Sequence, residues 1–379
     1  MNFFPLLFLG AIVCAHVYLL WCFHRALPDG SLGMRIFAGT VVAAGLASYL
    51  LRRHVLMWGP MAGKWLYFWV AFILVAVMFL ALKDCLHLAA LLADRLGGLE
   101  LARLFGGRRG ARIGLLIACL GVAYSFYEAY AVGVTRQEIK TSKLPPGRSR
   151  LRIVAVSDVH LTRRGDADRL TRLVRQINMQ KPDMVVMLGD LVDDQLLGQR
   201  DLLTELLKVE APLGRFAVLG NHERYNDWRQ AERFTVDAGF RILRGECVEA
   251  GGIVVAGVDD PVFHGSKGIT ETLNTATPGL FTLLLAHRPV TPPDAVGKFD
   301  LQLSGHTHGG QLRPMRFFTW LEFRRRQGLN RLSAPGGGES LLYLTNGAGY
   351  WGPPVRFLAP PEIVVVDVVR EDDPAEGGM

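Results

Sequence analysis

Potential metal ligands follow short apolar runs at five places after residue 150. The five places are Asp158-Val159-His160, Gly189-Asp190, Gly220-Asn221-His222-Glu223, His287 and Gly305-His306-Thr307-His308. The apolar runs have the composition of buried strands. Because parallel strands present their carboxyl ends at one edge of a sheet, we expect the residues that follow them to meet there. One such run would carry little weight, and it is the recurrence that indicates a site.

The residues at these places form a donor set that suits divalent metal ions. The set combines carboxylate, amide and imidazole groups without a thiolate, a mixture that favours Zn, Mn or Fe. The predicted ligands are Asp158, His160, Asp190, Asn221, His287, His306 and His308. They are more numerous than one tetrahedral site requires, so we expect two ions about 3.5–4 Å apart that share a bridging ligand. We choose Asp190 as the bridge, because a carboxylate offers two oxygens and a negative charge.

From residue 151 the sequence alternates short β-rich runs with helical stretches, and later the strands dominate. We predict helices over 166–180, 197–209 and 227–238. We predict strands over 151–157, 183–188, 215–219, 252–258, 280–286, 299–304, 341–346 and 362–369. This order predicts an α/β domain over 151–370 in which helices cover two packed sheets, a four-layer α-β-β-α sandwich. The acidic end, 371–379, is expected to be disordered.

The first 135 residues have the composition of an all-α membrane region. Four apolar runs are predicted to form transmembrane helices, at about 3–23, 34–51, 65–82 and 113–134. Residues 85–105 are expected to form an interfacial helix. Residues 136–150, interrupted by Pro145-Pro146-Gly147, are expected to form a linker. Basic residues flank the apolar runs in similar numbers on both sides, so the positive-inside rule leaves the side of the following domain unresolved.

The overall composition agrees with a membrane protein rather than a nucleic-acid-binding one. Of the 379 residues, 50% are hydrophobic, and the excess lies before residue 135. Arginines beside apolar helices account for the formal net charge of +7, so no nucleic-acid partner is expected. The five cysteines form no CxxC pair, which argues against a zinc ribbon or a disulfide framework. His16 and Glu128 fall within apolar runs. We expect His16 to hydrogen-bond a neighbouring helix and Glu128 to stand near the membrane interface.

The five motifs together resemble those of the calcineurin-like metallophosphoesterase superfamily, over about residues 151–370. The motifs are Asp158-x-His160, Gly189-Asp190-x-x-Asp193, Gly220-Asn221-His222-Glu223, His287 and Gly305-His306-x-His308. The later segments Asn346-Gly347-Ala348-Gly349 and Pro353-Pro354-Val355-Arg356-Phe357 are similar to those of a membrane-anchored bacterial branch. That branch is similar to the UDP-2,3-diacylglucosamine pyrophosphatases of lipid A synthesis. Together with the four apolar runs, this resemblance indicates a multi-pass protein of the inner cell membrane.

The resemblance also implies a role for each motif residue. One ion would be held by Asp158, His160, Asp190 and His308, and the other by Asp190, Asn221, His287 and His306. A hydroxide between the ions would attack phosphorus in line. His222 would be catalytic, either by hydrogen-bonding a phosphoryl oxygen or by protonating the leaving group, while Asp193 and Glu223 would orient the ligands. Arg288 departs from the neutral or acidic residue that is frequent in the family, and it would either meet a phosphate or face solvent.

Several other polar segments have two interpretations. Arg163-Arg164 could hold a phosphate or lie in a solvated loop. Arg324-Arg325-Arg326 follows the aromatic Phe317-Phe318-Thr319-Trp320, which could indicate nucleic acid, but beside a membrane region anionic headgroups are favoured. Asp259-Asp260 is expected to form a turn, and Asp193-Asp194 could instead cap a helix. The remaining histidines, expected to be structural, are His24, His54, His87 and His264.

The favoured function is that of a membrane-anchored dimetal phosphoesterase that hydrolyses a phosphodiester or diphosphate bond. UDP-2,3-diacylglucosamine is the most concrete substrate, and the expected partners are membrane lipids and a phosphorylated, lipid-linked substrate. The alternative enzyme is a general phosphodiesterase or phosphatase of nucleotides or cell-envelope polymers. The non-enzymatic alternative is a membrane sensor or scaffold with a metal-binding domain, and the complete ligand set argues against it.

Overall fold

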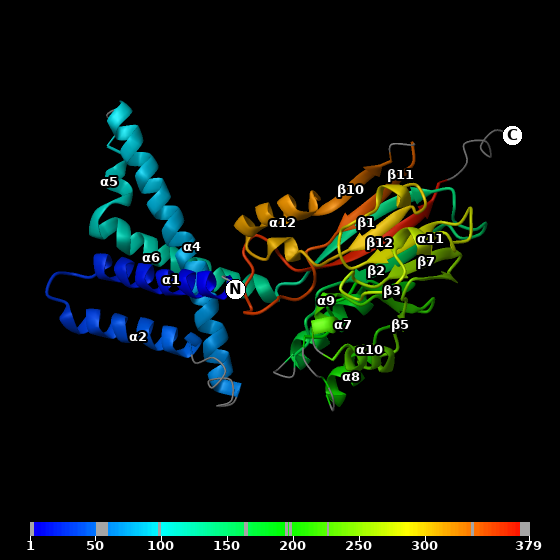
Figure 1. Ribbon diagram of the computed structural model, residues 1–379, viewed down its shortest axis with the longest axis horizontal. Coiled ribbons are helices and arrows are strands. Elements are labelled where there is room, and N and C mark those ends of the chain that lie inside the picture. The colour runs from blue at the N-terminus through cyan, green and yellow to red at the C-terminus, as the bar shows by residue number, and fades with distance from the viewer. Residues whose placement is uncertain are drawn as a thin grey trace. The chain divides into compact units, whose positions relative to one another are not determined.

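The computed structural model describes residues 4–50, 60–97, 100–162, 166–193, 196, 199–225, 227–334 and 337–371, and Figure 1 shows their secondary structure. Side chains are described from residue 10 in the first of these ranges and from residue 65 in the second. The chain divides into two compact units, Met1–Tyr127 with Gly352–Val355, and Glu128–Trp351 with Arg356–Met379. All the predicted metal ligands belong to the second unit.

The first unit is helical, as the apolar sequence predicts. Its helices are α1 (Phe4–Ala26), α2 (Leu32–Leu50), α4 (Pro60–Gly97), α5 (Ala102–Phe105) and α6 (Gly107–Tyr130), the last of which continues into the second unit. Among the described residues, three helices are long and apolar enough to cross a membrane: Leu32–Leu50, Trp65–Gly97 and Gly107–Tyr130. These correspond to the second, third and fourth predicted spans. Helix α1 covers the first predicted run, and its role as a fourth span stays a prediction.

Helix α4 differs from the prediction in its second half. The sequence predicted a span ending near residue 82 and a separate interfacial helix over 85–105, but α4 runs unbroken to Gly97. Lys83 and Asp84 interrupt the apolar sequence of α4, but their charges are neutralised locally. Lys83 pairs with Asp84, and the Tyr18 hydroxyl donates to Asp84 Oδ2 at 2.6 Å. Leucine and alanine, which are strong helix formers, dominate the residues that follow. The prediction of a break was therefore wrong.

The environment of His16 in α1 confirms its predicted role. Trp69 Nε1 of α4 donates to His16 Nε2 at 3.0 Å, and His16 Nδ1 donates to the carbonyl of Ile12 at 2.8 Å. Both ring nitrogens of this buried side chain are thus satisfied. The histidine joins two apolar helices, as polar side chains commonly do between membrane helices.

The second unit contains two six-stranded sheets. The first has the order β1-β12-β2-β3-β4-β5 and consists of β1 (Gly133–Thr141), β12 (Glu362–Arg370), β2 (Arg150–Val156), β3 (Met184–Met187), β4 (Arg215–Ala217) and β5 (Arg241–Ile242). The second has the order β10-β11-β9-β8-β7-β6 and consists of β10 (Gly328–Ser333), β11 (Glu339–Leu344), β9 (Leu301–Ser304), β8 (Thr282–Ala286), β7 (Ile253–Val258) and β6 (Glu246–Ala250). Strands β2, β3 and β4 are mutually parallel, and so are β7, β8 and β9.

Strand β1 lies where the sequence predicted the end of a helix and a linker over 136–150. It pairs in parallel with β12 along its whole length, from Gly133 beside Glu362 to Thr141 beside Arg370. It is an edge strand and is mostly exposed, so its residues lack the apolar run by which the buried strands were recognised. The linker prediction was therefore wrong for the first part of this segment.

Helices accompany both sheets. They are α7 (Ala167–Met179), α8 (Arg200–Leu207), α9 (Asn221–Tyr225), α10 (Trp228–Asp237), α11 (Ile269–Leu273) and α12 (Arg316–Phe323), together with the short 3₁₀ turns η1 (Pro293–Ala295), η2 (His308–Gly310) and η3 (Arg313–Met315). The mixed α/β architecture is confirmed.

Apolar clusters fill the spaces beside the two sheets. Successive residues of a strand point to opposite faces, so Val154 packs in a cluster with Leu173 of α7 while Ile153 packs in another cluster with Leu283 of the second sheet. Leu284 belongs to a third cluster, on the other face of that second sheet. The four-layer description as a whole stays a prediction.

The cluster between the first sheet and α7 provides a stability test. Leu170 on α7 is almost fully buried, so Leu170→Ala should lower the free energy of unfolding by about 2–5 kcal/mol, through lost apolar burial and a residual cavity. Leu207→Ala on the exposed end of α8 is the matched control and should change it by less than about 0.5 kcal/mol. Thermal unfolding of the purified chain in detergent measures both. Equal shifts would contradict the assignment of this core.

Candidate metal centre

The two sheets deliver the predicted ligands from the carboxyl ends of their parallel strands. Asp158 and His160 follow β2, Asp190 follows β3, and Asn221 begins α9 after β4. The remaining three come from the second sheet, where His287 follows β8 and the pair His306 and His308 follows β9. All seven of these side chains approach one another.

One group of donors is formed by Asp158, His160 and His308. The Nε2 atoms of His160 and His308 are 3.0 Å apart. His308 Nε2 is 3.6 Å from Asp158 Oδ1, and His160 Nε2 is 3.9 Å from Asp190 Oδ2. This group corresponds to the first predicted ligand set.

A second group is formed by Asp190, His287 and His306, with Asn221 beside them, and a third group, of His160, Asp193 and His222, contains one predicted ligand. His287 Nε2 is 3.2 Å from Asp190 Oδ2, 3.2 Å from His306 Nδ1 and 3.1 Å from Asn221 Oδ1. Asp190 Oδ2 therefore lies near the first group and the second. This is the position that the sequence predicts for a bridging carboxylate.

The hydrogen bonds of the histidines show that the cluster suits metal ions. His160 Nδ1 donates to Asp193 Oδ1 at 2.6 Å, and His287 Nδ1 donates to the carbonyl of Leu188 at 2.8 Å. In the neutral rings these bonds leave the Nε2 lone pairs directed into the cluster. The Nε2 lone pair of His160 lies 3.0 Å from His308 Nε2 and 3.9 Å from Asp190 Oδ2, where a cation could accept it. The donor set therefore fits divalent metal ions.

The backbone of the cluster adopts an unusual conformation. Five of the seven predicted ligands have positive φ angles, between 51° and 70°, and these are Asp158, His160, Asp190, His306 and His308. Residues other than glycine rarely adopt this region, and such strain concentrates at functional sites. The neighbouring Gly305 also needs to be a glycine, because a Cβ atom there would lie 1.9 Å from Ser157 Oγ and 2.3 Å from Asp158 Oδ2.

The protonation states of the donors differ from one another. Burial opposes protonation of His287, but the carboxylate of Asp190 prevails and raises the pKa of this ring to about 10, and burial raises the pKa of Asp158. These two donors would release a proton when they bind a metal ion. Burial lowers the pKa of His306 to about 3 and that of His308 well below its usual range, so both rings are neutral, as metal binding requires. Burial alone would raise the pKa of Asp190, but the facing imidazole of His287 outweighs it and holds this pKa below its ordinary value. Asp190 therefore carries the negative charge expected of a bridging carboxylate.

Asp193 links the cluster to His222. Its Oδ1 atom accepts from His222 Nδ1 at 2.7 Å as well as from His160. Burial opposes protonation of His222, but the hydrogen bond to Asp193 and the nearby carboxylates prevail and raise the pKa of His222 above its usual value. The His222 ring also makes edge contacts with Tyr225 and Trp351, at centroid distances of 5.4 and 6.0 Å. This histidine is thus oriented, and it holds its proton more strongly than an ordinary histidine does.

Glu223 holds the backbone of the ligand loops rather than any ligand side chain. Its carboxylate accepts hydrogen bonds from the backbone amides of Asp190, Val192 and Gly220, at 3.0, 3.0 and 2.8 Å. The side chain is almost fully buried. The orienting role that the resemblance implies is therefore exercised through the main chain of two neighbouring loops.

A buried arginine behind the cluster was missed by the sequence analysis. The guanidinium of Arg356 is fully buried. It donates to the carbonyls of Gly349, Ala359 and Asn346, at 2.8, 2.7 and 2.8 Å, and to His308 O and Nδ1, at 3.1 and 3.3 Å. The signal was present in the Pro-Pro-Val-Arg-Phe segment, which was noted as a motif without a role for its arginine.

Arg169 of α7 was also missed and acts in a comparable way. It is buried, pairs with Asp166, and donates to the carbonyls of Val159 and His160 at 2.7 and 3.2 Å. It therefore fixes the loop that carries two predicted ligands. An ordinary arginine on a helix has no sequence signature for such a contact.

Several remaining interpretations can be compared with the structure. Arg288 is paired within the domain, because its Nε donates to Asp260 Oδ2 at 2.7 Å, and a contact between this arginine and a phosphate stays a prediction. The turn predicted at Asp259-Asp260 is supported, since Asp260 Oδ1 accepts from the backbone amide of Val262. Asp193 contacts histidines rather than capping a helix. Arg163-Arg164, Asp194 and His54 lie outside the described residues.

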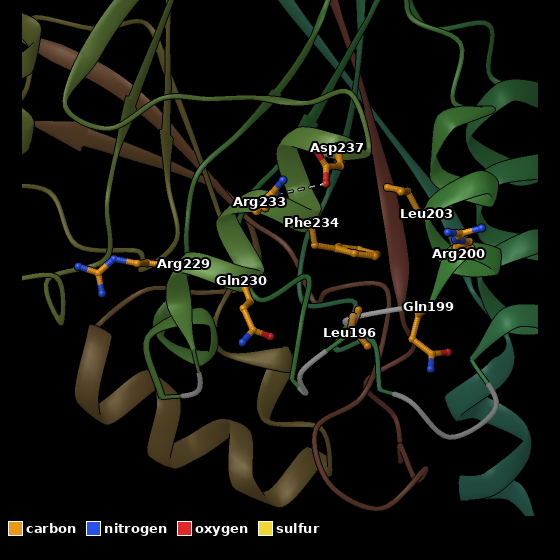
Figure 2. A pocket seen from close by; sticks show the side chains of 9 residues that line it. All are labelled: Leu196, Gln199, Arg200, Leu203, Arg229, Gln230, Arg233, Phe234 and Asp237. Carbon is orange, nitrogen blue, oxygen red and sulfur yellow. Dashed lines mark ion pairs between the residues drawn. The ribbon is translucent and has the colours of Figure 1, made fainter.

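A separate pocket lies between α8 and α10 and has a volume of about 340 Å³. Figure 2 shows the Phe234 ring extending toward α8. It also shows Arg233 paired with Asp237, with 3.9 Å between Arg233 Nε and Asp237 Oδ2. None of the predicted ligands lines this pocket. It is therefore distinct from the cluster of donors.

Substitution of Glu223 tests its structural role. In Glu223→Gln an amide nitrogen replaces one of the two acceptors and faces backbone N–H groups, so stability should fall by about 1–3 kcal/mol for each buried donor left unsatisfied. The variant should also retain less metal after dialysis. Thermal unfolding and elemental analysis measure the two effects, with the exposed Glu210→Gln as control. A variant that matches the wild type in both would refute the role.

Comparison with known proteins agrees with this geometry. A family model described as calcineurin-like phosphoesterase matches residues 151–310. An uncharacterized metallophosphoesterase of Aquifex aeolicus is 38% identical over 268 residues, which cover 67% of this chain and 98% of the relative. One from Bacillus subtilis is 32% identical, over 66% and 91% of the two chains. A Danio rerio relative named as a transmembrane protein with metallophosphoesterase domain is 30% identical, over 76% and 69%. The chain belongs to the calcineurin-like metallophosphoesterases, a family of metal-dependent phosphoester hydrolases.

Proposed function

We propose that this chain is a multi-pass enzyme of the inner membrane that hydrolyses a phosphodiester or diphosphate bond in an amphipathic substrate. The observation that carries the proposal is the position of Asp190 Oδ2, 3.2 Å from His287 Nε2 and 3.9 Å from His160 Nε2. One carboxylate between two histidine groups is the arrangement that a pair of divalent ions requires. The apolar helices of the first unit support the membrane location.

Two divalent ions, of manganese, zinc or iron, would be held by the two donor groups around Asp190. When bound, such ions supply a water-derived nucleophile at neutral pH and offset the charge of the phosphoryl group. The chain's own contribution is to fix the donors before the ions arrive. The hydrogen bonds of His160 to Asp193 and of His287 to Leu188 O set which ring nitrogen faces the cluster.

His222 is the residue that we assign to proton transfer. Its Nδ1 is engaged by Asp193 at 2.7 Å, so Nε2 is the atom free to act on the substrate. A raised pKa keeps a proton available there. The proton would pass to the leaving oxygen, and Asp193 would stabilise the ring while it is charged.

The substrate class is inferred from the surroundings of the cluster. Tyr225 and Trp351 contact His222, and Phe323 contacts His306 at a centroid distance of 5.6 Å. Tyr225 and Trp351 are largely exposed, so they offer faces on which a nucleobase or an acyl chain could pack. Together with the membrane helices these rings favour a nucleotide-activated or lipid-linked diphosphate. UDP-2,3-diacylglucosamine, cleaved to a lipid phosphate and UMP, is our specific proposal.

Removing the imidazole of His222 tests the mechanism. His222→Ala should lower kcat by about 10²–10⁴-fold, the usual contribution of a positioned acid or base. Metal content, measured by elemental analysis, should be unchanged, because no predicted ligand is altered. His264→Ala, at an exposed histidine outside the cluster, should retain full activity. Undiminished hydrolysis by His222→Ala with both metals bound would show that the proposed proton transfer is wrong.

The substrate proposal has its own test. The purified chain with manganese should release UMP from UDP-2,3-diacylglucosamine, and chelation of the metal should abolish the release. The same preparation should be supplied with simple nucleotides and a general phosphodiester, with free phosphate and alcohol as the measured products. Hydrolysis of the general substrates without any UMP from the diacylated one would eliminate the specific substrate and favour a general phosphodiesterase.

A further inference from the structure

An exposed apolar surface lies next to the candidate metal centre. It is formed by α12 and the residue before it, with five large apolar side chains exposed among seven consecutive residues: Met315, Phe317, Phe318, Trp320 and Leu321. Phe317 and Phe318 are 58% and 59% exposed. Soluble domains seldom leave such contiguous patches uncovered, and those that do use them for binding. We call these five residues the α12 surface.

Positive charge surrounds the α12 surface. Arg313 and Arg316 precede or begin the helix, and Arg324-Arg325-Arg326 follows it, whereas Glu322 is the one acidic residue within 313–326. None of these arginines forms an ion pair with a carboxylate within the part of the chain that the structure describes. Nε of Arg325 is buried without a hydrogen-bond partner, and the guanidinium of Arg324 stacks over Trp320 at 4.9 Å.

The α12 surface is fixed to the rim of the metal centre. The chain immediately before it is anchored by the amide of Arg313, which donates to the carbonyl of Phe357 at 2.8 Å. The last residue of the helix, Phe323, sets its ring edge to face with His306. The helix thus lies at the border of the cluster, and a large part of its apolar side chains faces away from the domain.

We infer that the α12 surface inserts into the interfacial region of an anionic lipid bilayer. Aromatic and aliphatic side chains on a short helix with flanking arginines suit the boundary between headgroups and acyl chains. The unpaired arginines supply the charge complementarity, since each basic residue near an anionic surface contributes about 1 kcal/mol. A polar protein partner would leave the exposed rings uncovered, and a purely apolar one would leave the arginines without counter-charge.

Insertion would place the rim beside His306 at the level of the lipid headgroups. A substrate with acyl chains could then present its phosphoryl group to the donors while its chains remain in the bilayer. The inference goes beyond the proposed function, because lipid contact at α12 does not require hydrolysis. Lipid contact at α12 can therefore be tested independently of the proposed hydrolysis.

The experiment uses the full chain in lipid nanodiscs of phosphatidylcholine with or without phosphatidylglycerol. The photoreactive p-benzoylphenylalanine, close in shape to the native side chain, is incorporated in place of Phe318. Irradiation followed by mass spectrometry should identify covalent lipid adducts, with phosphatidylglycerol in excess over its share of the bilayer. The same residue in place of Met179, which is 67% exposed on α7, is the control and should give no lipid adduct.

The charge contribution is tested by combining Arg324→Gln, Arg325→Gln and Arg326→Gln with the photoreactive residue. Adduct yield with phosphatidylglycerol should fall at least fivefold, since about 1 kcal/mol for a single basic residue already corresponds to roughly fivefold. Hydrolysis of the soluble substrate bis(p-nitrophenyl) phosphate should be retained and reports an intact centre. Three outcomes would each overturn the inference. They are adducts to the chain's own helices, the absence of any adduct at position 318, and a lipid adduct yield that is the same with and without phosphatidylglycerol.

Discussion

The charge of one buried carboxylate organises the second unit. Asp190 is almost fully buried, and its Oδ2 atom lies between His287 and His160 while its Oδ1 atom accepts from the amide of His222 at 2.8 Å. A buried anion is costly unless cations or hydrogen-bond donors compensate it. The loops of both sheets converge on this group. Their histidines lie beside its carboxylate, and divalent ions held by these side chains would compensate its charge.

The spacing between the two donor groups is set by the apolar core between the sheets. The ligands after β2, β3 and β4 belong to one sheet, and those after β8 and β9 belong to the other. The sheets meet through interlocked side chains such as Ile153 and Leu283, both fully buried. Because such cores are close-packed, the distance between the carboxyl ends of the strands is fixed before any metal binds. The packing of side chains between the two sheets therefore determines the distances between the predicted ligands.

The sequence was informative wherever a buried strand preceded a donor. All the predicted ligands gather because each apolar run forms a strand whose carboxyl end faces the same place. Strand β1 was not predicted, because an exposed edge strand needs no apolar run. The roles of Arg169 and Arg356 were not predicted either, since both act on backbone carbonyls that the fold alone brings near. Likewise, the left-handed backbone at five ligands has no signature in residue types.

The order of the strands has a consequence for biosynthesis. Strand β12 is the last in chain order and lies between β1 and β2 in the first sheet. Arg356, which hydrogen-bonds His308, comes shortly before this strand. Until translation has passed residue 370, β1 has no neighbour and the sheet stays open. A nascent chain thus carries all seven predicted ligands before the strand that joins β1 to β2 has been made.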